Sequence, residues 1–210
     1  MNFIESATES DIQKWSKFLA EAGSACSYES NAHEKKVKLL GAKFRIIGPY
    51  RKNGLSYTDT YVGHEWFNGI EMIEDKGLVA WVRFYEGGIT KPDFIRKDFT
   101  GEYIPKIIYE QLKSFLKKFP RDQPFRRGPS RMELNAYHYE DFSEGDFRYF
   151  YGRDRICLPI ERASEEIYGL TYSGGTIDNP HIKTRLLASP IYQMIPLIRS
   201  SQLRKNLEAA

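Results

Sequence analysis

The sequence contains one short pattern twice, first as Phe67-Asn-Gly69-Ile-Glu71-Met-Ile73 and then as Phe150-Tyr-Gly152-Arg-Asp154-Arg-Ile156. A second block follows each copy: Phe84-Tyr85-Glu-Gly87-Gly88 after the first and Thr171-Tyr172-Ser-Gly174-Gly175 after the second. The first block recurs after 83 residues, from 67 to 150, and the second after 87, from 85 to 172, so the connection between blocks grew by four residues. This repetition predicts two related structural units in one chain.

Each copy places an acidic residue beside a glycine on one face of an extended strand, Glu71 with Gly69 and Asp154 with Gly152, because alternate side chains share a face. A carboxylate between an aromatic residue and an isoleucine must be paired, protonated or turned toward a wet cavity, since its unpaired burial is costly. The glycine leaves room for a ring or a backbone. These features predict a concave site lined by aromatic residues and carboxylates, one in each half or one shared between them. The alternative is a buried pair of glutamate with tyrosine or arginine that only fixes strand register.

The candidate ligand-binding residues lie on these strands and their neighbours. Side chains alternate along Tyr57–Gly63, so Tyr57, Asp59 and Tyr61 share a face. Arg83 is placed to pair with Glu71. The full set of candidates is Tyr57, Asp59, Tyr61, Phe67, Glu71, Arg83, Tyr85, Phe150, Asp154 and Tyr172. No residue stands out as catalytic, and Glu71 and Asp154 would be the acid–base residues if the protein were an enzyme.

The first half begins with a helix. Residues 8–23 carry a helical apolar stripe, with Ser10 and Gln13 as the expected capping box and Gly23 as the expected stop. Residues 24–42 are polar and predict a loop with one short strand.

Four further strands are expected in the first half. They are Lys43–Ile47, Tyr57–Gly63, Phe67–Glu74 and Leu78–Tyr85. We expect Gly48-Pro49 to end the first of them and Gly87-Gly88 to end the last, with a turn at Asn53-Gly54. Residues 89–101 are expected to form a loop.

The second half also begins with a helix, predicted over Tyr103–Phe119, where Pro105 fits the first turn and Pro120 ends the helix. Residues 120–131 hold four arginines among prolines and predict a loop, either solvated or placed to meet phosphate groups. The expected strands are Asn135–Phe142, Asp146–Tyr151, Arg155–Ala163 and Ile167–Tyr172.

The order of elements predicts an α+β fold. We expect internally duplicated units of a helix and antiparallel strands, related by a pseudo-twofold axis, with the helices packed on antiparallel sheet. The expected halves are residues 1–101 and 102–177, together one compact domain, followed by a C-terminal helical extension at 178–210. The alternative is that two unrelated hairpins share common strand residues. Ser189-Pro190 suits a helix start, and that helix is expected either to pack on the protein's own surface or to form a homodimer contact.

The composition is that of a globular chain, with 41% hydrophobic and 28% charged residues among 210 and a net charge of +3. So small a charge gives no argument for nucleic acid as a partner. The chain lacks a signal peptide at its start and an apolar run of about 20 residues, so we expect a cytoplasmic protein without a membrane span. Cys26 and Cys157 are expected as free thiols. Histidines and cysteines show no ligand spacing, so neither a metal nor another cofactor is expected.

Short motifs throughout the chain point to a family. They are Phe18-Leu19-x-Glu21-Ala22, Tyr57-x-Asp59-x-Tyr61-x-Gly63, Pro124-Phe125-Arg126 with Gly128-Pro129, and the two copies of the repeated pattern. Over residues 10–177 the chain resembles a bacterial family known only as an uncharacterised domain of unknown function, which often lies C-terminal to helix-turn-helix regulators of the Xre type. Asp154, where the family usually has Glu, and the long extension depart from its pattern. The resemblance implies a ligand-sensing or interaction module of bacteria or phages, without established catalysis.

The residues favour a non-enzymatic module that binds or sequesters a ring-bearing small molecule, nucleotides included, in a cleft near the pseudo-twofold axis. One alternative is a hydrolase or transferase with Glu71 or Asp154 as general base, and tight pairing of both carboxylates with arginine or lysine would rule it out. Another alternative is a protein-interaction factor, such as a phage or host-directed effector, that acts through residues 121–131 or 178–210.

Overall fold

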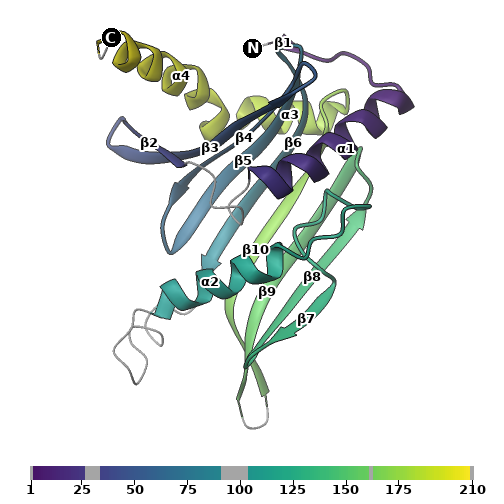
Figure 1. Ribbon diagram of the computed structural model, residues 1–210, viewed down its shortest axis with the longest axis vertical. Coiled ribbons are helices and arrows are strands. Elements are labelled where there is room, and N and C mark those ends of the chain that lie inside the picture. Colours follow the sequence, from purple (N-terminus) through teal and green to yellow (C-terminus); the bar gives the residue numbers. More distant parts are fainter. Residues whose placement is uncertain (1, 27–33, 91–103, 161–162, 209–210) are drawn as a thin grey trace.

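The centre of the molecule is a large, mostly antiparallel sheet. The computed structural model describes residues 2–26, 34–90, 104–160 and 163–208. Ten strands form the sheet, with nine in the order β2-β3-β4-β5-β6-β10-β9-β8-β7 (Figure 1). Their bounds are β2 (Glu34–Leu39), β3 (Ala42–Lys52), β4 (Leu55–Gly63), β5 (Trp66–Asp75), β6 (Leu78–Ile89), β7 (Arg131–Leu134), β8 (Tyr137–Gly145), β9 (Tyr149–Ile160) and β10 (Ala163–Thr176). The short β1 (Asn2–Phe3) pairs in parallel with β6.

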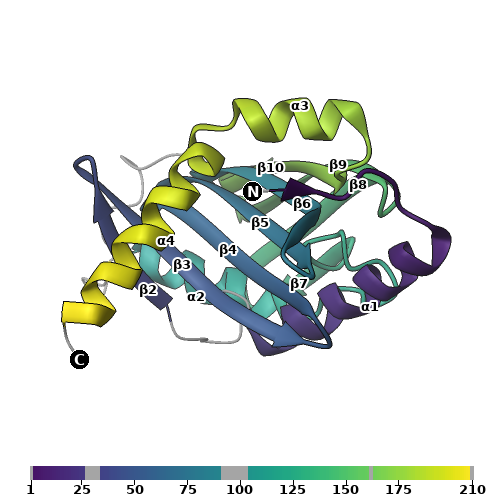
Figure 2. The same ribbon diagram turned by 90° about the horizontal axis from the view of Figure 1, so that it is seen from above.

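Four helices in the described part of the chain cover the sheet from both sides (Figure 2). Helices α1 (Glu9–Ala25) and α2 (Ile104–Leu116) lie on one face, and α3 (Pro180–Ala188) and α4 (Pro190–Glu208) lie on the other. The predicted α+β class with helices on an antiparallel sheet is confirmed. None of the helices in the described residues is long and apolar enough to cross a membrane.

Strand alternation separates the two cores. In β6, Trp81 and Tyr85 pack on the α1/α2 side, whereas Val82 and Phe84 pack on the α3/α4 side. The core on the α1/α2 side extends across the sheet from β3 to β8, but the main core on the other side lies over β5 and β6. On that second side, large aromatic side chains of β8 and β9 are exposed to solvent. Phe142 of β8, for example, is 60% exposed.

The first helix differs from the prediction at both ends. Its capping box is formed by Thr8 and Asp11, so the expected box beginning at Ser10 was wrong. The Thr8 hydroxyl accepts a hydrogen bond from the Asp11 N–H at 3.2 Å, and the Asp11 carboxylate accepts one from the Thr8 N–H at 3.1 Å. An acid there also meets the positive end of the helix dipole. The helix continues past Gly23, whose missing Cβ would lie 3.2 Å from Cζ of Phe119, so this glycine permits close packing and does not end the helix.

Two sequence pairs that were expected to end strands lie inside strands. β3 continues through Gly48-Pro49, where a register shift between Ile47 and Tyr50 removes the proline, which has no N–H, from the hydrogen-bonded ladder. β6 continues through Gly87-Gly88. A Cβ on the second of these glycines would lie 1.9 Å from the carbonyl oxygen of Glu65, so glycine allows a neighbouring backbone to approach closely.

Other elements confirm or correct the expected ones. The short strand expected within 24–42 is β2, and the turn expected at Asn53-Gly54 is present with both residues at positive φ. The strands predicted at 146–151 and 155–163 correspond largely to one long strand, β9, and Ala163 instead begins β10. β9 pairs with β10 along its length and with β8 from Phe150 to Cys157. Residues 161–162 lie outside the described residues. Of the predicted loop 89–101, the part from residue 91 on lies outside the described residues, as does Tyr103.

The C-terminal extension packs on the chain's own sheet. Asn179 caps α3, a helix that was not predicted, and α4 begins at Pro190 as expected. Ile182, Leu186 and Ile195 from these helices are buried against β5 and β6. Both cysteines are free and buried, which confirms the expected thiols.

The close approach at Gly88 generates a stability prediction. Gly88→Ala should destabilise the protein by about 3 kcal/mol, because the new methyl group overlaps the Glu65 carbonyl, which accepts a hydrogen bond from the Ile89 N–H. Gly41→Ala is the control: Gly41 also has a positive φ, of 81°, but no atom lies within 4 Å of its Cβ position, so only backbone strain of about 1–2 kcal/mol is expected. Urea unfolding of the variants measures both costs, and equal costs would show that the close approach is unimportant.

Candidate functional site

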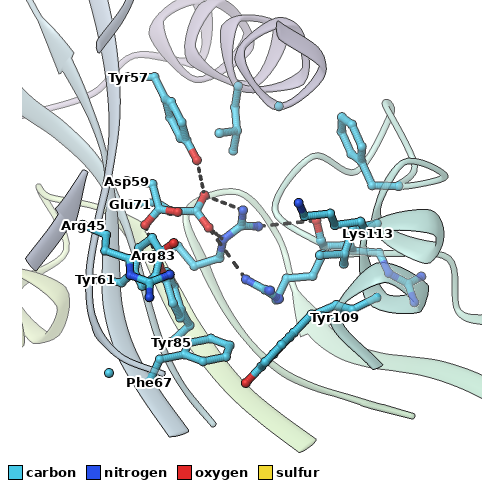
Figure 3. Close-up of a pocket in the computed structure, with 18 of the residues that line it drawn as sticks. Arg45, Tyr57, Asp59, Tyr61, Phe67, Glu71, Arg83, Tyr85, Tyr109 and Lys113 are labelled. Carbon is cyan, nitrogen blue, oxygen red and sulfur yellow. Dashed lines mark hydrogen bonds and ion pairs between the residues drawn. The ribbon is translucent and has the colours of Figure 1, made fainter. Parts of the chain in front are cut away.

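A cavity of about 470 Å³ lies on the α1/α2 side of the sheet (Figure 3). Its floor comes from β3 to β6, and its walls come from α1, α2 and the segment 124–127. Seven of the ten candidate residues line it: Tyr57, Asp59, Tyr61, Phe67, Glu71, Arg83 and Tyr85. The sequence pattern therefore brought together one group of side chains, all from the first half of the chain.

Glu71 is buried in the floor and is held by an arginine and a tyrosine. Arg83 donates from Nε to Glu71 Oε1 at 3.0 Å and from Nη2 to Oε2, a bidentate pairing. The Tyr57 hydroxyl donates to Oε2 at 3.0 Å. Glu71 lies directly opposite Arg83 in the β5–β6 pairing, so sheet register sets this geometry. Arg83 also donates from Nη1 to the Phe125 carbonyl at 3.0 Å and thereby ties the segment above the sheet to the floor.

Asp59 lies opposite Glu71 in the β4–β5 pairing and is also buried. The Tyr85 hydroxyl donates to Asp59 Oδ1 at 2.6 Å, and no other side chain in the described chain bonds to this carboxyl group. Burial and the neighbouring charge of Glu71 raise the pKa of Asp59 to about 8. Its surroundings therefore favour the neutral form of the Asp59 carboxyl group over the ionised form.

The glycine beside the acid is occupied by the protein's own ring. A Cβ on Gly69 would lie 2.1 Å from Cζ of Tyr85, so the Tyr85 ring crosses over Gly69 to reach Asp59. The gap predicted on this face exists, and a tyrosine from the adjacent strand fills it. Any side chain at position 69 would displace the ring and with it the hydrogen bond to Asp59.

A second set of side chains repeats these contacts in β8, β9 and β10. Asp141 lies opposite Asp154 and accepts a hydrogen bond from the Tyr172 hydroxyl. The Tyr172 ring crosses over Gly152, whose Cβ would lie 2.4 Å from Cζ of Tyr172. The Tyr139 hydroxyl donates to Asp154 Oδ2 at 3.3 Å, and this contact corresponds to the one at 3.0 Å between the Tyr57 hydroxyl and Glu71. At the centre of the sheet, Tyr85 and Tyr172 are register partners.

The three other candidate residues, Phe150, Asp154 and Tyr172, do not line the cavity. Phe150 packs between Trp81 and Phe125, with ring centroids 5.6 Å and 5.5 Å away. Asp154 and Tyr172 are buried in the second set. Above the second set, protein side chains fill the space that corresponds to the cavity above the first set.

Arg126 and Arg127 hold the second set, which corrects for these two residues the expectation that the arginines of 120–131 are either solvated or free to meet phosphate, whereas Arg121 and Arg131 are exposed. Arg127 Nε donates to Asp154 Oδ2 at 2.9 Å, and Arg126 Nη2 donates to the Asp141 carbonyl at 2.6 Å. The Gly128 N–H donates to Asp141 Oδ2 at 3.2 Å. The loop is drawn inward because the two buried carboxylates need partners.

Arg127 also reaches the cavity and joins the two sets. Its Nη1 lies 3.8 Å from Glu71 Oε1, and its guanidinium lies over the Tyr85 ring at 5.3 Å. Burial raises the pKa of Asp154 to about 6, although Arg127 opposes this rise. Asp154 Oδ1 has no hydrogen-bond partner among the residues that the structure describes.

The set of candidate residues chosen from the sequence left out the residues that face the cavity from other elements. These include Arg45 on β3, His64 after β4, Lys106, Tyr109, Glu110 and Lys113 on α2, and the arginines of the loop. The signal for α2 was present, because residues 106, 109, 110 and 113 share a helix face beside the apolar stripe. For Arg127 no local pattern exists, since its partners are 27 and 56 positions away in sequence.

Arginine pairing removes the basis for Glu71 or Asp154 as a general base. Both carboxylates accept charge-assisted hydrogen bonds from buried arginines, which the enzymatic alternative required to be absent. Among the described residues, no group of three or more histidine, cysteine, aspartate or glutamate side chains is arranged to hold a metal ion.

The fold and site define an α+β sheet domain with two buried carboxylate networks, one of which opens into a cavity. A family profile described as a domain of unknown function, DUF5680, matches residues 59–177, more than half of the chain, so the protein belongs to this family. The matched segment begins at Asp59 and includes both networks except Tyr57. No curated protein and no solved structure matches the chain.

The raised pKa of Asp59 predicts a pH dependence of stability. In the unfolded chain an aspartate has a pKa of about 3.9, so between about pH 4 and pH 8 the folded protein binds one more proton at Asp59 than the unfolded chain does. The contribution of Asp59 to stability is therefore complete below about pH 4 and declines as pH rises to about 8. Asp59→Asn should gain stability relative to the native protein over this window, by up to about 1.4 kcal/mol per pH unit.

Urea unfolding of both proteins at several pH values measures this difference. The difference between the two proteins isolates Asp59, because Asp154 titrates in both. A difference that does not change between pH 4 and pH 8 would show that Asp59 is ionised in the folded protein.

The pairing of Glu71 with Arg83 predicts non-additive effects of substitution. Arg83→Met should cost about 3–5 kcal/mol, because it leaves the buried Glu71 charge without its main partner. Adding Glu71→Gln should restore part of this loss, since the amide carries no charge. Chemical unfolding of the single and double variants measures the coupling, and an equally unstable double variant would argue that Glu71 is not the reason for the cost.

Proposed function

We propose that the protein is a non-enzymatic binding module for a ring-bearing polar small molecule, nucleotides included, which it holds in the cavity over β3 to β6. The observation that carries this proposal is the difference between two matching networks. The first has a cavity of about 470 Å³ above it, within the usual range for ligand sites of roughly 300–1,000 Å³. The second is covered by protein.

The covering of the second network serves as an internal comparison. Tyr139 stacks on Phe115 of α2 with ring centroids 5.0 Å apart and an interplanar angle of 19°. A Cβ on Gly128 would lie 2.4 Å from the Tyr139 hydroxyl, so the loop backbone closes over this ring. Its counterpart Tyr57 instead lines an open space. Close packing stabilises a protein, and an unfilled space costs stability. The space that stays open above the first network therefore suits a ligand.

The proposal includes the internal duplication expected from the sequence, with a pseudo-twofold axis at the Tyr85–Tyr172 pair. Both networks use an acid opposite an acid, a tyrosine over a glycine and a matching backbone hydrogen bond. The Ile89 N–H donates to the Glu65 carbonyl at 2.8 Å, and the Thr176 N–H, 87 positions after Ile89, donates to the Arg148 carbonyl at 3.1 Å. Two copies of one unit account for these agreements, and in this view one copy became structural while the other kept an open site.

The lining of the cavity fits a flat ring with polar edges. Phe67 stands beside Tyr61 and Tyr109, with ring centroids 6.4 Å and 6.2 Å away, and these rings form one aromatic wall (Figure 3). The Asp59 carboxyl group and the hydroxyl of Tyr57 lie at the floor. Aromatic walls with a few placed polar groups are typical of small-molecule sites.

Thermal unfolding with a panel of nucleotides, nucleosides and other ring-bearing metabolites tests the proposal. Compounds that bind the cavity should raise the melting temperature. A ligand concentration of 100 times its Kd increases the free energy of unfolding by about 2.7 kcal/mol. Phe67→Ala should abolish this rise, because it removes the centre of the aromatic wall.

Phe142→Ala is the matched control, since it removes the same ring from the exposed face of β8, away from the cavity. Each variant is compared with its own unliganded melting temperature. A panel without any stabilising compound, or a stabilisation that Phe67→Ala leaves intact, would contradict a binding function at this cavity.

A further inference from the structure

Asp59 differs from its neighbour Glu71 in how many hydrogen bonds its carboxyl group accepts. Glu71 accepts hydrogen bonds at both oxygens, from Arg83 and Tyr57. Asp59 is 6% exposed, and the Tyr85 hydroxyl donates to its Oδ1 at 2.6 Å. Within the part of the chain that the structure describes, no group donates to Oδ2 of Asp59. Because an acceptor this deeply buried is costly without a donor, Oδ2 is a place where a bound molecule gains by donating.

The second network shows which donors fit such a carboxyl group. Asp141 corresponds to Asp59, since each lies opposite the acid of the next strand and accepts a hydrogen bond at Oδ1 from a tyrosine of the sheet centre. Unlike Asp59, Asp141 also accepts hydrogen bonds at Oδ2. The Gly128 N–H donates to Oδ2 at 3.2 Å, and Arg126 Nε donates to it at 3.4 Å. Both donors are N–H groups of the loop after α2, so the protein itself satisfies this oxygen.

Over the first network the corresponding place belongs to the cavity, because Asp59 lines it. The nearby arginines are engaged by other carboxylates. Arg83 pairs with Glu71, and Arg127 Nε donates to Asp154 at 2.9 Å. The loop therefore serves the second network, and a molecule in the cavity can reach Oδ2 of Asp59.

The aromatic wall stands next to this oxygen. Tyr61 follows Asp59 by two residues and shares its face of β4. Phe67 lies beside Tyr61 and Tyr85, with ring centroids 6.4 Å and 6.0 Å away, and Figure 3 shows Asp59 on the same side of the cavity as these rings. A flat ring on this wall points an edge at Asp59. An amino group bonded to the ring lies close to the ring plane, as the N–H groups of a guanidinium do, so it can donate from that edge.

We propose that the ligand is a ring compound with an amino group at its edge, and that this amino group donates a hydrogen bond to Oδ2 of Asp59. It takes the place that the N–H groups of Arg126 and Gly128 have beside Asp141. This inference rests on the binding function proposed above and names the chemical class that the site accepts. The contact is open to Asp59 in either protonation state, since a carboxyl group keeps acceptor lone pairs in both.

Three pairs of nucleosides test the contact, because the members of each pair differ by one amino group on the ring. The pairs are guanosine with inosine, adenosine with purine riboside, and cytidine with zebularine. In isothermal titration of the whole chain, at least one amino compound should bind about tenfold or more tightly than its partner, because the partner leaves Oδ2 without that donor. This comparison uses the native protein and depends on no variant.

Asp59→Ala should abolish the preference, so that both members of the pair bind with similar affinity. Asp75→Ala is the matched control, because it also truncates a buried aspartate of this sheet, but one that accepts a hydrogen bond from Trp15 at 2.9 Å and does not line the cavity. The control should keep the preference. Circular dichroism and the melting temperature of each variant establish that it is folded before the titration.

The two proposals fail in different ways. If the members of every pair that binds have equal affinity, or if Asp59→Ala leaves the preference intact, the amino contact is overturned while the binding function stands. If no nucleoside binds, each compound of the wider panel that stabilises the protein is compared with its analogue without the amino group. Stabilising compounds that lack such a group, or that lose no affinity without it, overturn the contact. A panel without any stabilising compound overturns both proposals.

Discussion

The burial of carboxylates in the middle of the sheet is the constraint on which the arrangement depends. Each of the four acids, Asp59, Glu71, Asp141 and Asp154, lies on the α1/α2 face, where leaving it unpaired would cost several kcal/mol. Their partners come from other strands and from the loop after α2. Sheet register brings the tyrosines and Arg83 into place, and the loop supplies Arg126 and Arg127. The helices cover a face on which each of these carboxyl groups accepts at least one hydrogen bond, although Oδ1 of Asp154 has no partner among the described residues.

Much of this could be predicted from local patterns, because strands alternate and glycine leaves space. The repeated pattern correctly placed Glu71 and Asp154 on one face and paired Glu71 with Arg83. It also indicated that a ring fits beside each acid. What it could not show is that the ring is the protein's own tyrosine, since that depends on which residue stands opposite the glycine across the strand pair.

The features missed from sequence depend on contacts between distant segments. Gly87-Gly88 resembles a turn, but its role comes from the backbone of Glu65, which only the folded chain brings close. Arg126 and Arg127 look like residues of a solvated loop in the sequence, because charged residues among prolines usually lie at the surface. The cavity over one network and the covered state of the other follow from how α2 lies across the sheet, and no short motif encodes that.

Arg127 links the two networks through shared electrostatics. It is anchored by Asp154, outside the cavity, and extends its remaining donors toward Glu71 and Tyr85 within it. A change of charge at Asp154 alters where this guanidinium rests and so alters the field that an occupant of the cavity experiences. One guanidinium thus couples Asp154 on β9 to Glu71 on β5 and Tyr85 on β6, so substitutions at these positions should not have independent effects.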